Sequence, residues 1–203
     1  EQYIDTRIRG ALSLLQYNQY NYTGIVVDGN FKKPIFSGKV NVNDPNLFME
    51  FDGVVDVSKN ENIYKFTTQI DYANLHALQF MKDSISVFKG KVYSNLIGNS
   101  IDNLHGEVLV EQTSYQNVKD IYIFDNFKLV SSFDANRERT ITINSPDIVE
   151  GKVVGKFDFY DVPDIIENAL GSIYTNYKPN KVRKGQYLKF NFSIFNKIVE
   201  IFF

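Results

Sequence analysis

The sequence predicts an all-β protein built around an elongated, curled, mostly antiparallel sheet with one apolar face. Aromatic residues that suit pleated, half-buried surfaces are abundant, with 17 Phe and 13 Tyr against two Met. Apolar and polar residues alternate with a period of two along most of the 203 residues. Glycine also recurs within these runs, at positions that share the apolar side.

Seven alternating runs each predict a half-buried strand: 36–42, 47–57, 64–72, 127–133, 141–143, 153–159 and 188–194. A turn at Asn43, Asp44 and Pro45 separates the first two runs. Extended over the whole chain, the pattern predicts about a dozen strands. No Gly/Ser linker or block of charge divides them, so we expect residues 1–203 to form one domain.

One amphipathic helix is predicted over residues 162–177. Asp161 suits its N-cap, Pro163 suits its first turn, and Pro179 ends it. Its apolar residues recur at three-to-four spacing and include Ile165, Ile166, Ala169, Leu170 and Ile173. A shorter segment, 72–80, predicts one or two helical turns.

A local repeat places glycine two and four residues before apolar side chains. It starts at Gly38, Gly53, Gly90, Gly106, Gly151 and Gly155. In a strand these positions share a face, so the missing side chains let the apolar face become concave without crowding. The alternative is that the glycines mark β-bulges or strand starts in an ordinary sandwich.

Two architectures can remove such an apolar face from water. The sheet either covers itself as a closed β-sandwich, or stays open as a trough that requires an apolar ligand such as lipid acyl chains. The pattern leaves both open. Residues on the apolar side that would line a trough include Leu47, Phe66, Ile70, Val92, Phe127, Leu129, Ile141, Ile143, Phe190 and Phe192.

Composition and motifs argue against several classes of function. The net charge of −2 gives no positive field for nucleic acid. No cysteine is present, and His76 and His105 lie in no metal-ligand spacing. Nucleophile elbows, phosphate loops and dinucleotide fingerprints are missing from the sequence, so we expect no enzyme, cofactor or metal. No apolar run approaches the ~20 residues that span a bilayer.

For three polar or aromatic clusters we prefer a structural explanation to a functional one. The carboxylates Asp44, Asp52, Asp56, Asp102 and Asp125 are expected to be solvated rather than paired for acid-base chemistry. A basic group is expected to be a solvated loop rather than a site for lipid head groups: Lys178, Lys181, Arg183, Lys184 and Lys189. Tyrosines 17, 20 and 22 are expected to pack across strands rather than stack on carbohydrate.

The chain resembles the later part of TamB-type proteins of the AsmA-like superfamily, in the divergent form seen in Bacteroidota. The similarity covers essentially the whole chain and rests on residues 17–31, 36–57, 70–78, 98–111 and 143–159. The resemblance implies a taco-shaped sheet with a continuous hydrophobic groove on its concave face. The groove residues it implies are Val40, Val42, Met49, Phe51, Val55, Val57, Val108, Val110, Val153, Phe157 and Phe159.

The resemblance also implies a role and a location. Such proteins are not enzymes; they are anchored in the inner membrane, reach across the periplasm, and are linked to moving phospholipids between the inner and outer membranes. They are also linked to assembly of outer-membrane proteins with a barrel partner of the BamA/TamA type. Because the chain starts at Glu1 without Met and ends on apolar residues, we expect it to be cut from a longer protein that carries the anchor.

Two functional hypotheses follow. The first is a non-enzymatic lipid conduit that also supports envelope assembly, and the alternative is a β-sandwich adhesin or carbohydrate-binding module. In the first, the helix 162–177 would plug the trough with Ile165, Ile166, Ala169, Leu170 and Ile173. The less specific expectation is that this helix merely packs an edge or closes the sheet.

Overall fold

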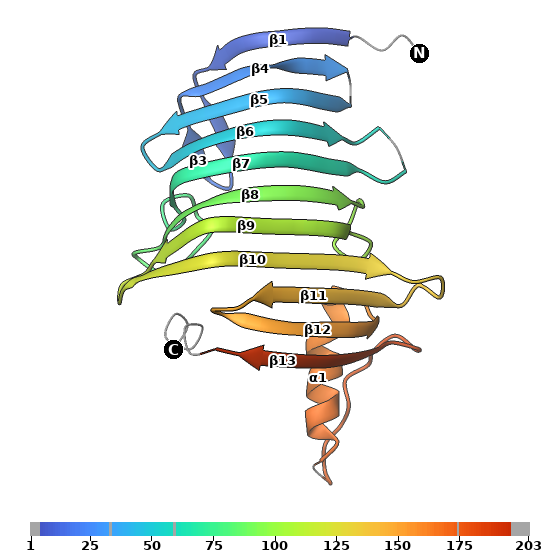
Figure 1. Ribbon diagram of the computed structural model, residues 1–203. Coiled ribbons are helices and arrows are strands. Elements are labelled where there is room, and N and C mark those ends of the chain that lie inside the picture. Colours follow the sequence, from blue (N-terminus) through green and yellow to red (C-terminus); the bar gives the residue numbers. More distant parts are fainter. Residues whose placement is uncertain (1–4, 33, 59, 174, 196–203) are drawn as a thin grey trace.

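The computed structural model describes residues 5–32, 34–58, 60–173 and 175–195 and shows a single large antiparallel sheet (Figure 1). Eleven strands form it in the order β1-β4-β5-β6-β7-β8-β9-β10-β11-β12-β13, and β2 and β3 form a separate hairpin. The strands are β1 (Asp5–Leu12), β2 (Leu15–Tyr17), β3 (Tyr20–Tyr22), β4 (Ile25–Lys32), β5 (Ile35–Asp44), β6 (Leu47–Asp56), β7 (Ile63–Asn74), β8 (Val87–Ile97), β9 (His105–Gln116), β10 (Ile121–Phe133), β11 (Arg139–Ser145), β12 (Val149–Lys156) and β13 (Tyr187–Ile194).

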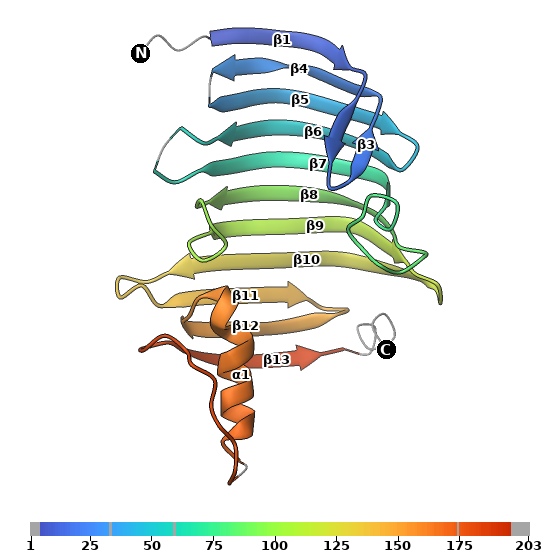
Figure 2. The ribbon, with the colours of Figure 1, turned by 180° about the vertical axis from the view of Figure 1, so that it is seen from behind.

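The sheet is open. Each strand pairs with its neighbour along the chain, apart from the hairpin inserted between β1 and β4 and a helical segment inserted between β12 and β13. Strands β1 and β13 lie at opposite ends of the stack (Figures 1 and 2). The prediction of a curled, open antiparallel sheet is therefore confirmed, and the closed β-sandwich is not the fold of this chain.

The strand register places apolar residues of all eleven strands on one face. Val27, Val40 and Phe51 stand side by side on β4, β5 and β6, and the next residues along form the charged row Asp28, Lys39 and Asp52 on the opposite face. We call the face that carries Val40 the inner face and the face that carries Lys39 the outer face. Ion pairs link outer-face neighbours, for example Lys39 Nζ and Asp52 Oδ2 at 3.3 Å.

Glycines let the strands approach closely on the inner face. Gly29, Gly38 and Gly53 are direct cross-strand neighbours. A Cβ atom on Gly38 would lie 2.3 Å from the Cα of Gly29, and one on Gly53 would lie 2.4 Å from the Cβ of Phe66. All six repeat glycines share the inner face, as predicted; only Gly90 coincides with a shift of register, so the bulge alternative applies there.

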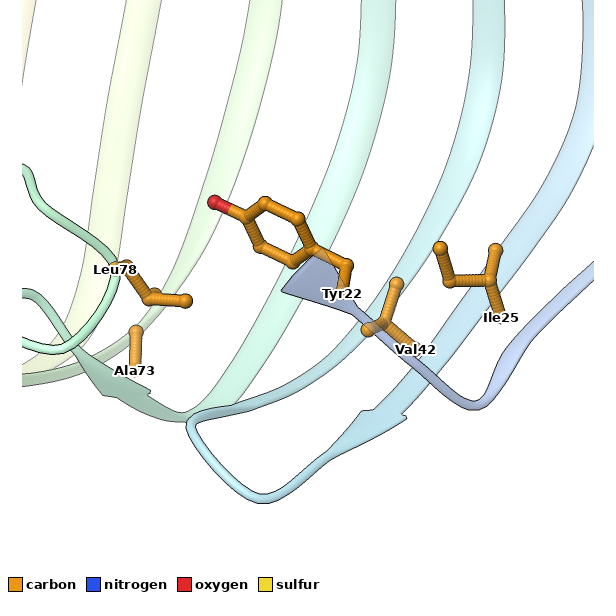
Figure 3. Close-up of a cluster of buried hydrophobic side chains, with 5 residues drawn as sticks. All are labelled: Tyr22, Ile25, Val42, Ala73 and Leu78. Carbon is orange, nitrogen blue, oxygen red and sulfur yellow. The ribbon is translucent and has the colours of Figure 1, made fainter. Parts of the chain in front are cut away.

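A hairpin and a loop cover one end of the inner face. Strands β2 and β3 fold back over the sheet and meet residues 75–86, and together they enclose a small core (Figures 2 and 3). Tyr22 from the hairpin and Leu78 from the loop pack with the inner-face residues Ile25, Val42 and Ala73. The prediction of one or two helical turns over 72–80 is wrong for residues 72–74, which belong to β7, but one turn with helical hydrogen bonding follows, in which the N–H of Leu78 donates to the carbonyl of Asn74 at 3.0 Å.

The carboxylate of Asp44 fastens this hairpin. It accepts hydrogen bonds from the hydroxyl of Tyr20, from the backbone and side chain of Thr23, and from the backbone of Asn46. Asp44 is only 1% exposed and Asp56 is 7% exposed, so the expectation that both carboxylates are solvated is wrong. In both cases hydrogen bonds replace water: those of Asp44 come mainly from the distant hairpin, whereas Asp56 accepts locally from the backbone and hydroxyl of Ser58.

The predicted helix is shorter than expected. Helix α1 spans Val162–Gly171 after a 3-10 turn, η1 (Phe159–Asp161), and so ends well before Tyr177. The chain reverses after the helix, and the ring of Tyr177 packs directly against Gly171. A Cβ atom at position 171 would lie 2.5 Å from that ring, so only glycine allows this contact. The Tyr177 hydroxyl also donates to Asn168 Oδ1 at 2.9 Å, which fixes the reversal.

Candidate functional site

The candidate site is the uncovered part of the inner face, an apolar groove between the β2–β3 hairpin and α1. Register places all the predicted lining residues on this face within strands, except Val57, Phe157 and Phe159, which lie beyond strand ends. The residues that the register places on this face are Val40, Val42, Leu47, Met49, Phe51, Val55, Phe66, Ile70, Val92, Val108, Val110, Phe127, Leu129, Ile141, Ile143, Val153, Phe190 and Phe192.

The run 153–159 is not one strand. β12 ends at Lys156, because the next backbone donors bind side chains instead of a neighbouring strand. The N–H of Asp158 donates to Gln186 Oε1, and the N–H of Phe159 donates to Asp102 Oδ1, both at 2.7 Å. The rings of Phe157 and Phe159 nevertheless stay on the apolar side, where they meet edge to face.

Side chains in the middle of the groove contact each other and remain reachable. The rings of Phe36, Phe51 and Phe66 follow one another across β5, β6 and β7, with centroids 6.2 and 5.1 Å apart. Like Val40 and Val108 they are half-buried rather than buried. This arrangement offers dispersion contacts and hydrophobic burial without directional hydrogen bonds, which suits a flexible apolar ligand.

The predicted lining set omitted several inner-face residues. Ile25, Val27, Phe36 and Leu96 occupy the same cross-strand rows as predicted lining residues. Leu188 shares the inner face of β13 with Phe190 and Phe192, and both Leu188 and Phe36 lie in predicted alternating runs. The same period-two alternation applies to these residues. Aligning each strand with its neighbours would have placed them on the inner face.

An apolar cavity of about 290 Å³ lies between α1 and the last strands. Its lining contains no charged residue: Ile141, Val153, Phe157, Phe159, Val162, Ile166, Leu188, Phe190 and Phe192. Of the five residues predicted to plug the trough, only Ile166 lines this cavity. Leu170 is 62% exposed and Ile173, which lies beyond the helix, is 78% exposed. The five residues therefore do not fill the trough together, as the plug hypothesis predicted.

Helix α1 is attached mainly through its N-terminal end. Asp161, just before the helix, accepts hydrogen bonds from Gln186 and from Arg183 Nε, the latter at 2.9 Å. These two bonds lower the pKa of the Asp161 carboxyl below its usual range. The far end of the helix extends past β13, beyond the edge of the sheet (Figure 2). The basic residues after the helix are exposed, as expected, although Arg183 pairs with Asp158 and Asp161.

Arg139 secures the end of the groove opposite the hairpin, and nothing in the sequence pattern indicated it. It is only 3% exposed and donates to Ser131 Oγ and to the carbonyl of Ile101, both at 3.0 Å, and to the carbonyl of Leu104. Its guanidinium also lies over the ring of Phe159, 4.7 Å from the centroid. Arg139 therefore holds residues 98–104 across the inner face.

Among the described residues, no group of three or more His, Asp or Glu side chains could hold a metal ion. His76 lies in the turn after β7, and Nδ1 of His105 lies 3.1 Å from the carbonyl oxygen of Asn103. Tyr20 and Tyr22 pack edge to face at 4.8 Å, but both lie on β3, so this contact is not the predicted packing across strands. Tyr17 is the cross-strand neighbour of Tyr20 and is 63% exposed. Within the described ranges, no helix has the length and hydropathy needed to cross a bilayer.

No family model, curated protein or solved structure matches the chain.

Proposed function

We propose that this chain binds the acyl chains of phospholipids in its inner-face groove and serves as one segment of a lipid conduit in a bacterial cell envelope. The observation that carries the proposal is the open sheet, whose inner face is apolar on every strand from β1 to β13. An uncovered apolar surface of this kind is unusual in a soluble monomer and favours an apolar ligand.

Acyl chains fit the chemistry of this surface. Burial of each methylene contributes about 0.8 kcal/mol and needs no directional partner. One cross-strand row offers similar apolar contacts from Val27, Val40 and Phe51, is interrupted by Thr68 on β7, and continues with Val92 and Val110. A chain that leaves one row meets a comparable row on the next strand, so movement along the groove would need no energy source in this segment.

The larger setting is also part of the proposal and rests on the resemblance to TamB-type proteins. In that setting a longer protein, anchored in the inner membrane, crosses the periplasm and moves phospholipids between the two membranes. It also supports outer-membrane protein assembly with a BamA/TamA-type barrel. Neither an enzymatic step nor a cofactor is proposed. The adhesin or carbohydrate-binding alternative remains a prediction that no observation on the groove favours.

A matched pair of substitutions on β6 tests acyl binding. Phe51 lies on the inner face and Phe48 on the outer face of the same strand. Phe51→Arg should abolish binding of a fluorescent fatty-acid probe and the copurification of phospholipid measured by mass spectrometry. Phe48→Arg should leave both unchanged. Circular dichroism and a cooperative thermal melt establish that both variants fold. A folded wild-type chain that binds no probe and carries no lipid would refute the proposal.

A further inference from the structure

A polar pocket of about 560 Å³ lies at the Arg139 end of the groove. Basic residues at its rim and wall are Arg137, Arg139, Lys156 and Lys184, and the acidic residues there are Glu61, Asp102 and Asp158. Two of the acidic groups have partners: Asp158 pairs with Arg183 at 2.7 Å, and Asp102 accepts the N–H of Phe159.

The charge of Arg139 is the central feature of this pocket. All the hydrogen-bond acceptors of its guanidinium are neutral, namely one hydroxyl and backbone carbonyls. Burial lowers the pKa of Arg139, and Asp102 opposes that effect. A buried cation without a bound carboxylate is costly, and an anion close by would offset this cost. Among the described residues, Arg137, Lys156 and Lys184 also form no ion pair.

The polar pocket adjoins the apolar cavity under α1. Phe157 lines both, so a molecule with a charged end and a hydrocarbon end can occupy them together. We propose that the pocket beside Arg139 binds the phosphate of an amphiphile whose hydrocarbon chain lies in the cavity under α1 and in the groove. This inference rests on the proposed function and adds an orientation for the lipid. The headgroup lies at the Arg139 end, and the hydrocarbon chain extends from there along the inner face.

Two double variants of the full chain separate headgroup binding from acyl binding. Arg137→Ala/Lys184→Ala removes two rim cations and keeps Arg139, whose loss would also release residues 98–104. Lys152→Ala/Lys189→Ala removes two exposed cations from the outer face of β12 and β13 and serves as the control for charge. The probes are a fluorescent lysophospholipid, a fluorescent alcohol of the same chain length, and inorganic phosphate.

The first double variant should weaken lysophospholipid binding by about tenfold or more, because charge-assisted hydrogen bonds are lost. Its affinity for the alcohol should match that of the wild type, and the control variant should bind both probes normally. Unchanged lysophospholipid affinity, or an equal loss for both probes, would overturn the headgroup site. If the wild type binds inorganic phosphate but binds the lysophospholipid no more tightly than the alcohol, the pocket is a site for free phosphate, and the proposal that it binds an amphiphile is overturned. If the wild type binds neither fluorescent probe, the proposed function itself fails.

Discussion

The hydroxyl of Tyr20 donates a 2.6 Å hydrogen bond to Oδ1 of Asp44 and so joins the β2–β3 hairpin to the end of β5. The hydroxyl also accepts from Asn46 Nδ2 at 3.0 Å, and Oδ2 of Asp44 accepts from Thr23. This network lies at the edge of the core that covers one end of the groove. The position of the hairpin therefore depends on the charge of one buried carboxylate.

Acid should release this hairpin. Burial is the largest influence on the Asp44 carboxyl and raises its pKa, but hydrogen bonds from Tyr20, Asn46 and Thr23 together outweigh it, so the pKa lies below the usual value. Because the pKa of Asp44 is lower in the folded state than in the unfolded state, the ionised carboxylate stabilises the folded state above pH about 4. This stabilisation is lost as the pH falls through the folded-state pKa. Protection of the backbone amides of residues 20–23 against hydrogen exchange, after correction for the intrinsic exchange rate at each pH, should therefore decrease as the pH falls below about 4.

Asp44→Asn supplies the control for this pH dependence. The amide cannot ionise, so protection of the hairpin against exchange, corrected for the intrinsic rate, should be lower than in the wild type at neutral pH and nearly independent of pH in the acid range. Asp161 also has a lowered pKa and affects the α1 region, which makes exchange in residues 20–23 the specific readout. Equal acid sensitivity in the variant and the wild type would mean that another group controls the hairpin.

A side chain at Gly38 should destabilise the sheet. Its Cβ would lie 2.3 Å from the Cα of Gly29 and 2.5 Å from the carbonyl oxygen of Asp28, so the strands would have to separate. Gly38→Val should lower the free energy of unfolding by about 1–3 kcal/mol, measured by urea denaturation. Gly10→Val, on the inner face of β1, meets no atom within 4 Å and should be tolerated. A similar loss in both variants would contradict the close-approach explanation.

Loss of the Arg139 side chain should release residues 98–104. Arg139→Met removes the donor to the carbonyl of Ile101 and leaves the carbonyl of Leu104 with the Ser131 hydroxyl as its remaining donor, and an unmet buried acceptor costs about 1–3 kcal/mol. Unfolding free energy should fall accordingly, and proteolysis should begin at this loop. The exposed neighbour Arg137 provides the comparison, since Arg137→Met should change stability by no more than about 0.5 kcal/mol.

Filling the cavity under α1 should reduce acyl binding. Ile166 lines that cavity, so Ile166→Trp places additional volume in a space of about 290 Å³. Binding of the fluorescent fatty-acid probe should weaken, with little change in the thermal melt. Leu170→Trp is the matched control, because Leu170 is 62% exposed and does not line the cavity. Probe binding by Ile166→Trp at the wild-type level would show that the acyl chain does not enter this cavity.

Local patterns determined most of the strands and the face on which each side chain lies. The alternation around Phe51 and Phe157 correctly separated apolar from polar positions, and the repeat glycines correctly marked the inner face. The start of α1 at Val162 was predicted, and Pro163 lies in its first turn as expected, but the Asp161 carboxylate makes no capping hydrogen bond and accepts from Arg183 and Gln186 instead. Period-two alternation fixes a face because successive side chains in a strand point in opposite directions.

Tertiary structure alone decided what covers that face. The helix ends at Gly171 because Tyr177 folds back onto it, and Asp44 is buried because a hairpin reaches it from more than 20 residues away. Arg139 binds carbonyls 35 to 38 residues distant. An open groove and a closed sandwich have the same alternation in each strand, and they differ only in whether distant strands meet. That choice depends on long-range contacts, which a period of two residues does not encode.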